Sequence, residues 1–107
     1  MSKLYFIETN GGWLTVATDE DGRACYMHED GREDGYPDAD PRWAEADAQE
    51  RETIAENWLR SIAEWNSFDD LYANCDMQNG FCGVYTAEDF SADLENGSGE
   101  IIASIDF

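Results

Sequence analysis

Positively charged residues are scarce in this sequence. Its 107 residues include one Lys and five Arg against 25 Asp and Glu, so the formal net charge is −19. Residues 61–107 contain no Lys or Arg at all. DNA, RNA and anionic membranes bind proteins of the opposite charge, which argues against direct contact with any of them. The charge predicts that the complementary partner is a basic macromolecule.

Long apolar stretches are also missing, since no apolar run exceeds a few residues. We therefore expect no transmembrane helix. The segment "KLYFIE" follows Met1 without the apolar region and cleavage site of a signal peptide, which predicts an intracellular protein. The composition nevertheless supports a packed core, with 42% hydrophobic residues, four Trp, five Tyr and five Phe. A single domain over residues 1–107 is expected.

Metal-ligating residues are few: one His and three Cys. Cys25, His28, Cys75 and Cys82 could in principle complete a Cys₃His zinc site, or the last two could form a disulfide. The spacing differs from that of a zinc knuckle, and an extended strand would point residues 25 and 28 to opposite faces. Neither of the acidic stretches "DEDG" (19–22) and "YPDADP" (36–41) contains the calcium-loop series D-x-[DN]-x-[DN]-G. We predict buried free cysteines, no metal and no cofactor.

Signatures of catalysis are absent as well. The sequence has no G-x-G-x-x-G or P-loop, and no nucleophile elbow near His28. Carboxylates abound, but acid–base catalysis needs environments that separate their pKa values, and these carboxylates occur in runs that are typical of exposed surface. The sequence therefore predicts a protein that is not an enzyme.

Short β-rich segments predict an antiparallel sheet. Segments 4–8 and 13–18 are joined by an Asn-Gly turn, and "DEDG" leads into a third strand over 23–28. Which face of the second strand is buried stays open, since both are partly apolar. Two further strands are expected over 81–85 and 100–107, the last buried through Ile101, Ala103 and Ile105. Residues 86–95 fit either a strand or a helix capped by Thr86.

Hydrophobic spacing predicts one long helix over residues 52–66. Its apolar stripe consists of Ile54, Trp58, Ile62 and Trp65, with Leu59 at the margin. A helix start is expected at Asp40 and Pro41, with a break near 47–51 because Asp47 would otherwise enter the stripe. A short second helix over 67–72 is capped by Ser67 and Asp70. The predicted fold is α+β: an N-terminal three-stranded meander plus C-terminal strands, packed against one long and one short helix.

Acidic residues dominate the long loop 29–41, and a loop of that length indicates function or disorder. We expect the acids there and on the two helices to contact the partner, with Glu45, Glu52 and Glu56 along one helix face. Tyr36, Trp43 and Tyr72 are the candidate aromatic anchors. The candidate partner-binding acids are Glu29, Asp30, Glu33, Asp34, Asp38, Asp40, Glu45, Glu52, Glu56, Asp69, Asp70 and Asp76.

The meander 4–28, the helix "ETIAENWLRSIAEWN" and the acidic "SFDDLYANCD" together resemble small acidic inhibitors of phages and mobile elements that mimic DNA, of the anti-CRISPR and anti-restriction type. The resemblance lies in charge and topology, and segment 81–107 departs from it. It implies an inhibitor in the cytoplasm of a bacterial host cell. The expected partner is a basic nucleic-acid-binding protein, a nuclease of a bacterial defence system, and foremost an RNA-guided nuclease.

Two other classes of protein fit part of this pattern. An immunity protein that neutralises a basic nuclease toxin would have the same length, charge and α+β build. An ordinary domain of a halophile would also be rich in Asp and Glu and poor in Lys, but it would unfold in low salt. The uneven placement of the acids favours a binding function over general solubility.

Overall fold

The computed structural model describes residues 2–9, 12–29, 41–75, 82–97 and 99–107. Its elements, in chain order, are β1 (Lys3–Thr9), β2 (Gly12–Thr18), β3 (Arg23–Glu29), the 3₁₀ turn η2 (Trp43–Glu45), α1 (Ala48–Trp65), α2 (Phe68–Cys75), β4 (Cys82–Thr86), α3 (Ala87–Glu95) and β5 (Glu100–Asp106). No helix within these ranges is long and apolar enough to cross a membrane.

The strands form one antiparallel sheet in the order β4-β3-β2-β1-β5. The predicted N-terminal meander is confirmed, and the α+β fold with it. Thr9 pairs with Gly12, as the short Asn-Gly connection requires, and Gly22 adopts a φ of 83° in the turn between β2 and β3. The two later strands then extend the meander at its two edges, β4 beside β3 and β5 beside β1.

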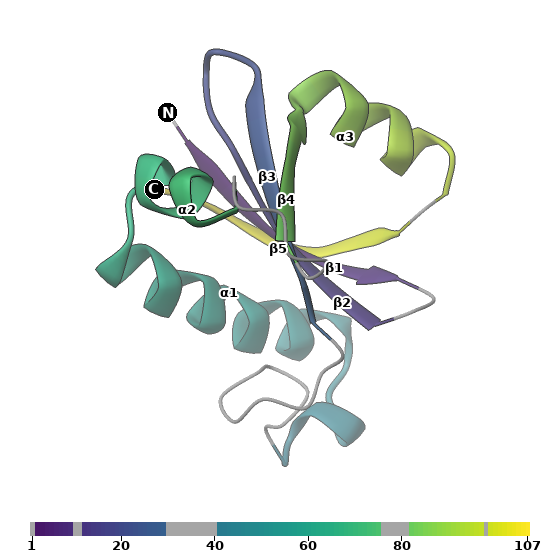
Figure 1. Cartoon of the computed structure of the whole chain (residues 1–107). Coiled ribbons are helices and arrows are strands. Elements are labelled where there is room, and N and C mark those ends of the chain that lie inside the picture. The colour runs from purple at the N-terminus through teal and green to yellow at the C-terminus, as the bar shows by residue number, and fades with distance from the viewer. Residues whose placement is uncertain (1, 10–11, 30–40, 76–81, 98) are drawn as a thin grey trace.

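Both faces of the sheet are covered, α1 and α2 lying on one side and α3 on the other (Figure 1). Leu4, Phe6 and Ala17 belong to the larger core beneath α1 and α2. Ile7 and Val16 alternate with them and pack with Phe90 of α3. The question left open for the second strand is thereby answered, because its two faces are buried against different helices.

Helix α1 begins at Asp47, whose side chain accepts a hydrogen bond from the backbone N–H of Glu50 at 2.8 Å. The predicted break near residue 47 is confirmed, since a carboxylate there caps the helix instead of entering its apolar face. The predicted helix start at Pro41 is wrong, and Asp40 lies outside the described residues. Pro41 lies in a turn that leads only to η2, so Glu45 precedes α1 and does not share a helix face with Glu52.

The buried face of α1 differs from the predicted stripe. Ile54 is buried as expected, but Leu59 is fully buried rather than marginal, and Trp65 is 80% exposed. At about 100° per residue, Trp65 lies roughly 20° around the helix from buried Ile54, so its exposure follows from its place as the last residue of α1 and not from the helix face. The prediction that Trp65 is a core residue is therefore wrong, and a large aromatic side chain lies on the surface.

The two shorter helices both have capped N-termini. The Ser67 hydroxyl accepts from the backbone N–H of Asp70 at 3.2 Å, and the Asp70 carboxylate accepts from the backbone N–H of Ser67 at 2.9 Å. This is the predicted capping box of α2. The ambiguous segment 86–95 is helical, because Thr86 Oγ1 accepts from the backbone N–H of Asp89 at 3.0 Å. The Thr86 hydroxyl thereby accepts from a backbone N–H that, in a strand, would have donated to the neighbouring strand.

Strand β5 contains a shift in register against β1. Phe6 pairs with Ala103, whereas the next residue, Ile7, pairs with Ile101. Ile101 is consequently 42% exposed, and Ile102 packs against the large core in its place. The predicted buried set was right for Ala103 and wrong for Ile101.

Two cysteines of the described chain, Cys25 and Cys75, are buried in the large core, and neither is in a disulfide. The Sγ of Cys75 lies 3.5 Å from the carbonyl oxygen of Tyr26, to which it donates. The alternative disulfide from Cys75 to Cys82 is therefore not formed. Within the described ranges no three His, Cys, Asp or Glu residues are grouped closely enough to hold a metal ion.

Candidate functional site

A wide groove of about 1340 Å³ lies where the β2–β3 turn, the C-terminal half of α1, the start of α2 and the end of β5 meet. Seven carboxylates line it, but only two guanidinium groups, those of Arg23 and Arg60. The seven acids are Asp19, Glu20, Asp21, Glu56, Glu64, Asp69 and Asp106. The groove therefore has a strongly negative potential, which its low-dielectric walls strengthen.

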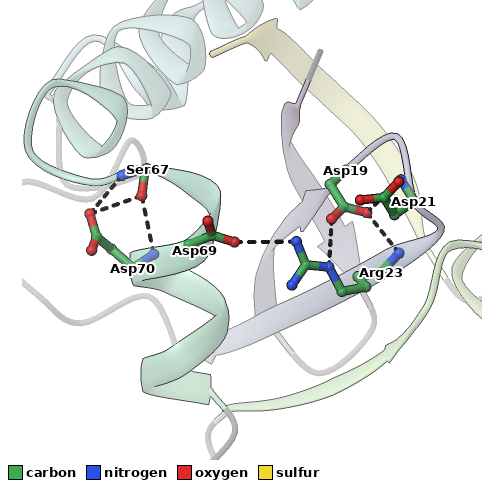
Figure 2. A network of polar contacts seen from close by, with 6 residues as sticks. All are labelled: Asp19, Asp21, Arg23, Ser67, Asp69 and Asp70. Carbon is green, nitrogen blue, oxygen red and sulfur yellow. Dashed lines mark hydrogen bonds and ion pairs between the residues drawn. The ribbon is translucent and has the colours of Figure 1, made fainter.

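Asp19 is the most enclosed of these acids, its side chain being 7% exposed. Its carboxylate accepts from the backbone N–H groups of Asp21 at 3.0 Å and Arg23 at 2.8 Å, and from Arg23 Nε at 2.7 Å (Figure 2). Burial alone would raise the pKa of Asp19. The hydrogen bonds from Arg23 and Asp21, with the attraction of the guanidinium, outweigh it and hold the pKa below its usual value.

Arg23 joins this turn to helix α2. Its Nη2 atom lies 3.2 Å from Oδ1 of Asp69, and its guanidinium carbon lies 5.1 Å and 5.2 Å from the ring centroids of Phe68 and Tyr72. The hydrogen bond to Asp19, with the nearby charges, raises the pKa of Arg23 above its usual value. The guanidinium is thus held by two carboxylates and two aromatic rings at once.

Asp69 and Asp70 are neighbours in the sequence with different roles. Figure 2 shows Asp69 turned toward Arg23, while Asp70 turns toward Ser67. Hydrogen bonds from the Ser67 backbone N–H and hydroxyl lower the pKa of Asp70. The carboxylate of Asp70 is therefore already used in capping α2, whereas Asp69 lines the groove.

The other basic groups near the groove are also paired with acids. Arg60 Nη2 lies 3.2 Å from Glu56 Oε2, and Lys3 Nζ lies 3.6 Å from Asp106 Oδ1. Within the described part of the chain, Asp21 and Glu64 have no ion-pair partner. The groove therefore keeps a surplus of carboxylate charge after its own cations are satisfied.

Aromatic side chains are placed differently from the sequence expectation. Trp43 is only 8% exposed and packs edge-on against Trp13 at 5.4 Å, so it belongs to the core and cannot anchor a partner. Tyr72 is half-buried and lies against Arg23. Tyr36 is outside the described residues. The exposed aromatic side chain in the groove is Trp65, which the sequence assigned to the core.

The structure brings together only part of the predicted partner-binding set. Glu56 and Asp69 line the groove, while Glu45 and Glu52 are exposed outside it. Glu29 ends β3, and no side chain is described there. The remaining candidates lie outside the described residues: Asp30, Glu33, Asp34, Asp38, Asp40 and Asp76.

Several groove acids were not on the predicted list. Asp19, Glu20 and Asp21 form the "DEDG" turn, which the sequence marks as a hairpin turn and as nothing more. Glu64 and Asp106 become neighbours of that turn only through the fold. The available signal for these acids was the run of three carboxylates within one turn, because the side chains of turns are exposed on the surface.

Comparison with known proteins found no relative of this chain. No family model, curated protein or solved structure matches the chain.

Proposed function

We propose that this protein is an acidic DNA-mimic inhibitor that binds the basic DNA-binding site of a nuclease, most specifically as an anti-CRISPR protein that blocks target recognition by an RNA-guided nuclease. The observation that carries the proposal is the surplus of carboxylates in the groove, whose own arginines are already paired. Proteins that hold DNA use arrays of Lys and Arg, which carboxylates on a folded scaffold can occupy in place of phosphates.

The arrangement of the acids supports this proposal in a second way. Four further acids lie on α3, on the opposite side of the sheet: Glu88, Asp89, Asp93 and Glu95. The described part of α3 and β5 has no basic residue to neutralise them. Negative charge on several sides of one small domain speeds association with a basic cleft through electrostatic steering.

A competition experiment tests the proposal. The purified chain is added to guide-loaded nucleases and restriction nucleases, and binding of a labelled DNA duplex is followed by anisotropy at about 50 mM and about 300 mM NaCl. We expect one nuclease to lose its DNA, with the inhibition constant rising at the higher salt. Polyglutamate at equal charge concentration is the control for unspecific attraction. A folded protein that displaces DNA from none of the nucleases at low salt contradicts the proposal.

An immunity protein against a basic nuclease toxin is the second candidate, and exposed Trp65 favours it. Phosphate mimicry needs charge alone, whereas a dedicated interface with one cognate protein is commonly built around a central aromatic anchor. Inhibition of a basic nuclease toxin, with no effect on any defence nuclease, would support this candidate over the first.

A further inference from the structure

Trp65 lies in an unusual position for so large an apolar side chain. It is the last residue of α1, is 80% exposed, and forms part of the wall of the acidic groove. Four further apolar residues line the same groove: Ala63, Phe68, Ile105 and Phe107. An exposed aromatic side chain within an apolar patch, rimmed by polar groups, is typical of a protein-binding site.

The protein uses one arrangement twice to hold its own arginines. Arg23 lies over Phe68 and Tyr72 and pairs with Asp19 and Asp69. Arg51 lies 5.2 Å from the centroid of the Trp43 ring and donates from Nε to the Trp43 carbonyl oxygen at 3.1 Å. In both cases an aromatic face supplies the stacking surface and oxygen atoms accept the guanidinium hydrogens.

Trp65 and its neighbours offer the same components without an internal arginine. No arginine of the described chain stacks on the Trp65 indole, and Glu64 and Asp21 provide carboxylates without an ion-pair partner among the described residues. Arg60 lines the groove but pairs with Glu56. A guanidinium from outside the molecule would complete the arrangement, whereas an ammonium would lack the planar fork.

We propose that this groove binds an arginine-bearing segment of a basic protein, one guanidinium stacking on Trp65 and pairing with carboxylates of Glu64 and the β2–β3 turn. The inference rests on the proposed function for the basic character of the partner, and it names the surface and side chain that recognise it. It places the recognition of this guanidinium in the groove.

Titration with a nona-arginine peptide tests the inference on the full chain. In ¹⁵N-labelled protein the four Trp indole N–H signals are separable, and Trp65→Phe assigns the relevant one. We expect saturable shifts of the Trp65 indole and of the Asp21 and Glu64 amides, with weaker binding of a nona-lysine peptide. Trp65→Ala should weaken arginine binding by about threefold to tenfold. Unchanged affinity in Trp65→Ala contradicts the inference.

Two charge-matched double variants distinguish binding in the groove from attraction by the net charge alone. Asp21→Asn with Glu64→Gln should weaken binding of the peptide severalfold, whereas Asp93→Asn with Glu95→Gln, on exposed positions of α3, should change it little. Both variants remove two negative charges and keep the side-chain shapes. Equal weakening by the two pairs, with shifts spread over all acidic segments, overturns the groove as the site.

The same variants distinguish failure of this inference from failure of the proposed function. If a nuclease is inhibited and the groove variants inhibit as well as the parent protein, the groove is not the contact surface and the inhibitory function stands. If the groove binds the arginine peptide through Trp65 but no nuclease is inhibited, the inference stands and the proposed function fails.

Discussion

Arg23 and Asp19 are joined by two hydrogen bonds across the β2–β3 turn. The Nε atom of Arg23 lies 2.7 Å from Oδ2 of Asp19, and the backbone N–H of the same arginine donates to Oδ1 at 2.8 Å. One carboxylate thus fixes both the main chain and the side chain of one residue. Because Arg23 also reaches Asp69, the turn and helix α2 are linked at the edge of the groove.

Replacing Arg23 should loosen that link. Arg23→Ala removes two ion pairs and the stacking on Phe68 and Tyr72, so we expect a lower Tm and a pKa of Asp19 that rises toward its ordinary value. Arg60→Ala is the control, since its i,i+4 pair with Glu56 on the helix surface is worth only ~0.3–0.5 kcal/mol. Thermal unfolding and NMR titration of the carboxylates measure both effects. An equal fall in Tm for the two variants would contradict the role of Arg23.

The capping carboxylate of Asp70 predicts a pH dependence of stability. Its folded pKa lies below the ordinary value of 3.8, so the charged form stabilises the fold above that value, and the contribution is lost as the pH falls through the folded pKa. The difference in unfolding free energy between the parent protein and Asp70→Asn should therefore be full at pH 6 and shrink as the pH falls below about 4. Urea unfolding at a series of pH values measures it. A difference that stays constant down to the lowest pH argues against the ionised cap.

Leu59 and Trp65 should respond in opposite ways to truncation. Leu59 is fully buried, so Leu59→Ala should reduce the free energy of unfolding by about 2–5 kcal/mol. Trp65 is mostly exposed, and Trp65→Ala should change it by no more than about 0.5 kcal/mol. Chemical denaturation followed by circular dichroism gives both values. A large loss of stability in Trp65→Ala would show that this residue belongs to the core, as the hydrophobic spacing predicts.

Because of the register shift in β5, two adjacent isoleucines contribute differently to the free energy of unfolding. Ile102 packs against the large core, so Ile102→Ala should cost roughly 1–2 kcal/mol of stability, about half the value for a fully buried side chain. Ile101 is the matched control, because it is 42% exposed and has the same side chain. If Ile101→Ala is the more damaging variant, the strand has the unshifted register instead.

The sequence predicted the fold correctly where interactions between residues close in the chain determine the structure. The Asn-Gly signal between Thr9 and Gly12 and the turn at 19–22 predicted the meander, and the Ser67–Asp70 box predicted the start of α2, because each depends on residues a few positions apart. At the start of β5, by contrast, Gly99 packs so closely on β1 that an added Cβ would lie 2.7 Å from Cγ2 of Ile7. Such a contact between distant segments has no pattern in the sequence itself.

The candidate site was less predictable for the same reason. Charge counting found that acids dominate, and it found Glu56 and Asp69, but the groove is assembled from four segments that meet only in the fold. Trp43 is buried outside the predicted helix, and Trp65 is exposed at the end of α1 because periodicity shows which helix face is apolar and not whether the last residue of the helix is buried. The acids of the loop 29–41 stay a prediction.

The position of β1 between β2 and β5 has a consequence for synthesis on the ribosome. Residues 3–29 emerge early and need only short turns to pair, but the other edge of β1 waits for residues 100–106. Until then its backbone groups are a template for pairing with another nascent chain. Like charges on such intermediates repel, so the excess of acids acts before folding is complete by keeping unfinished copies apart.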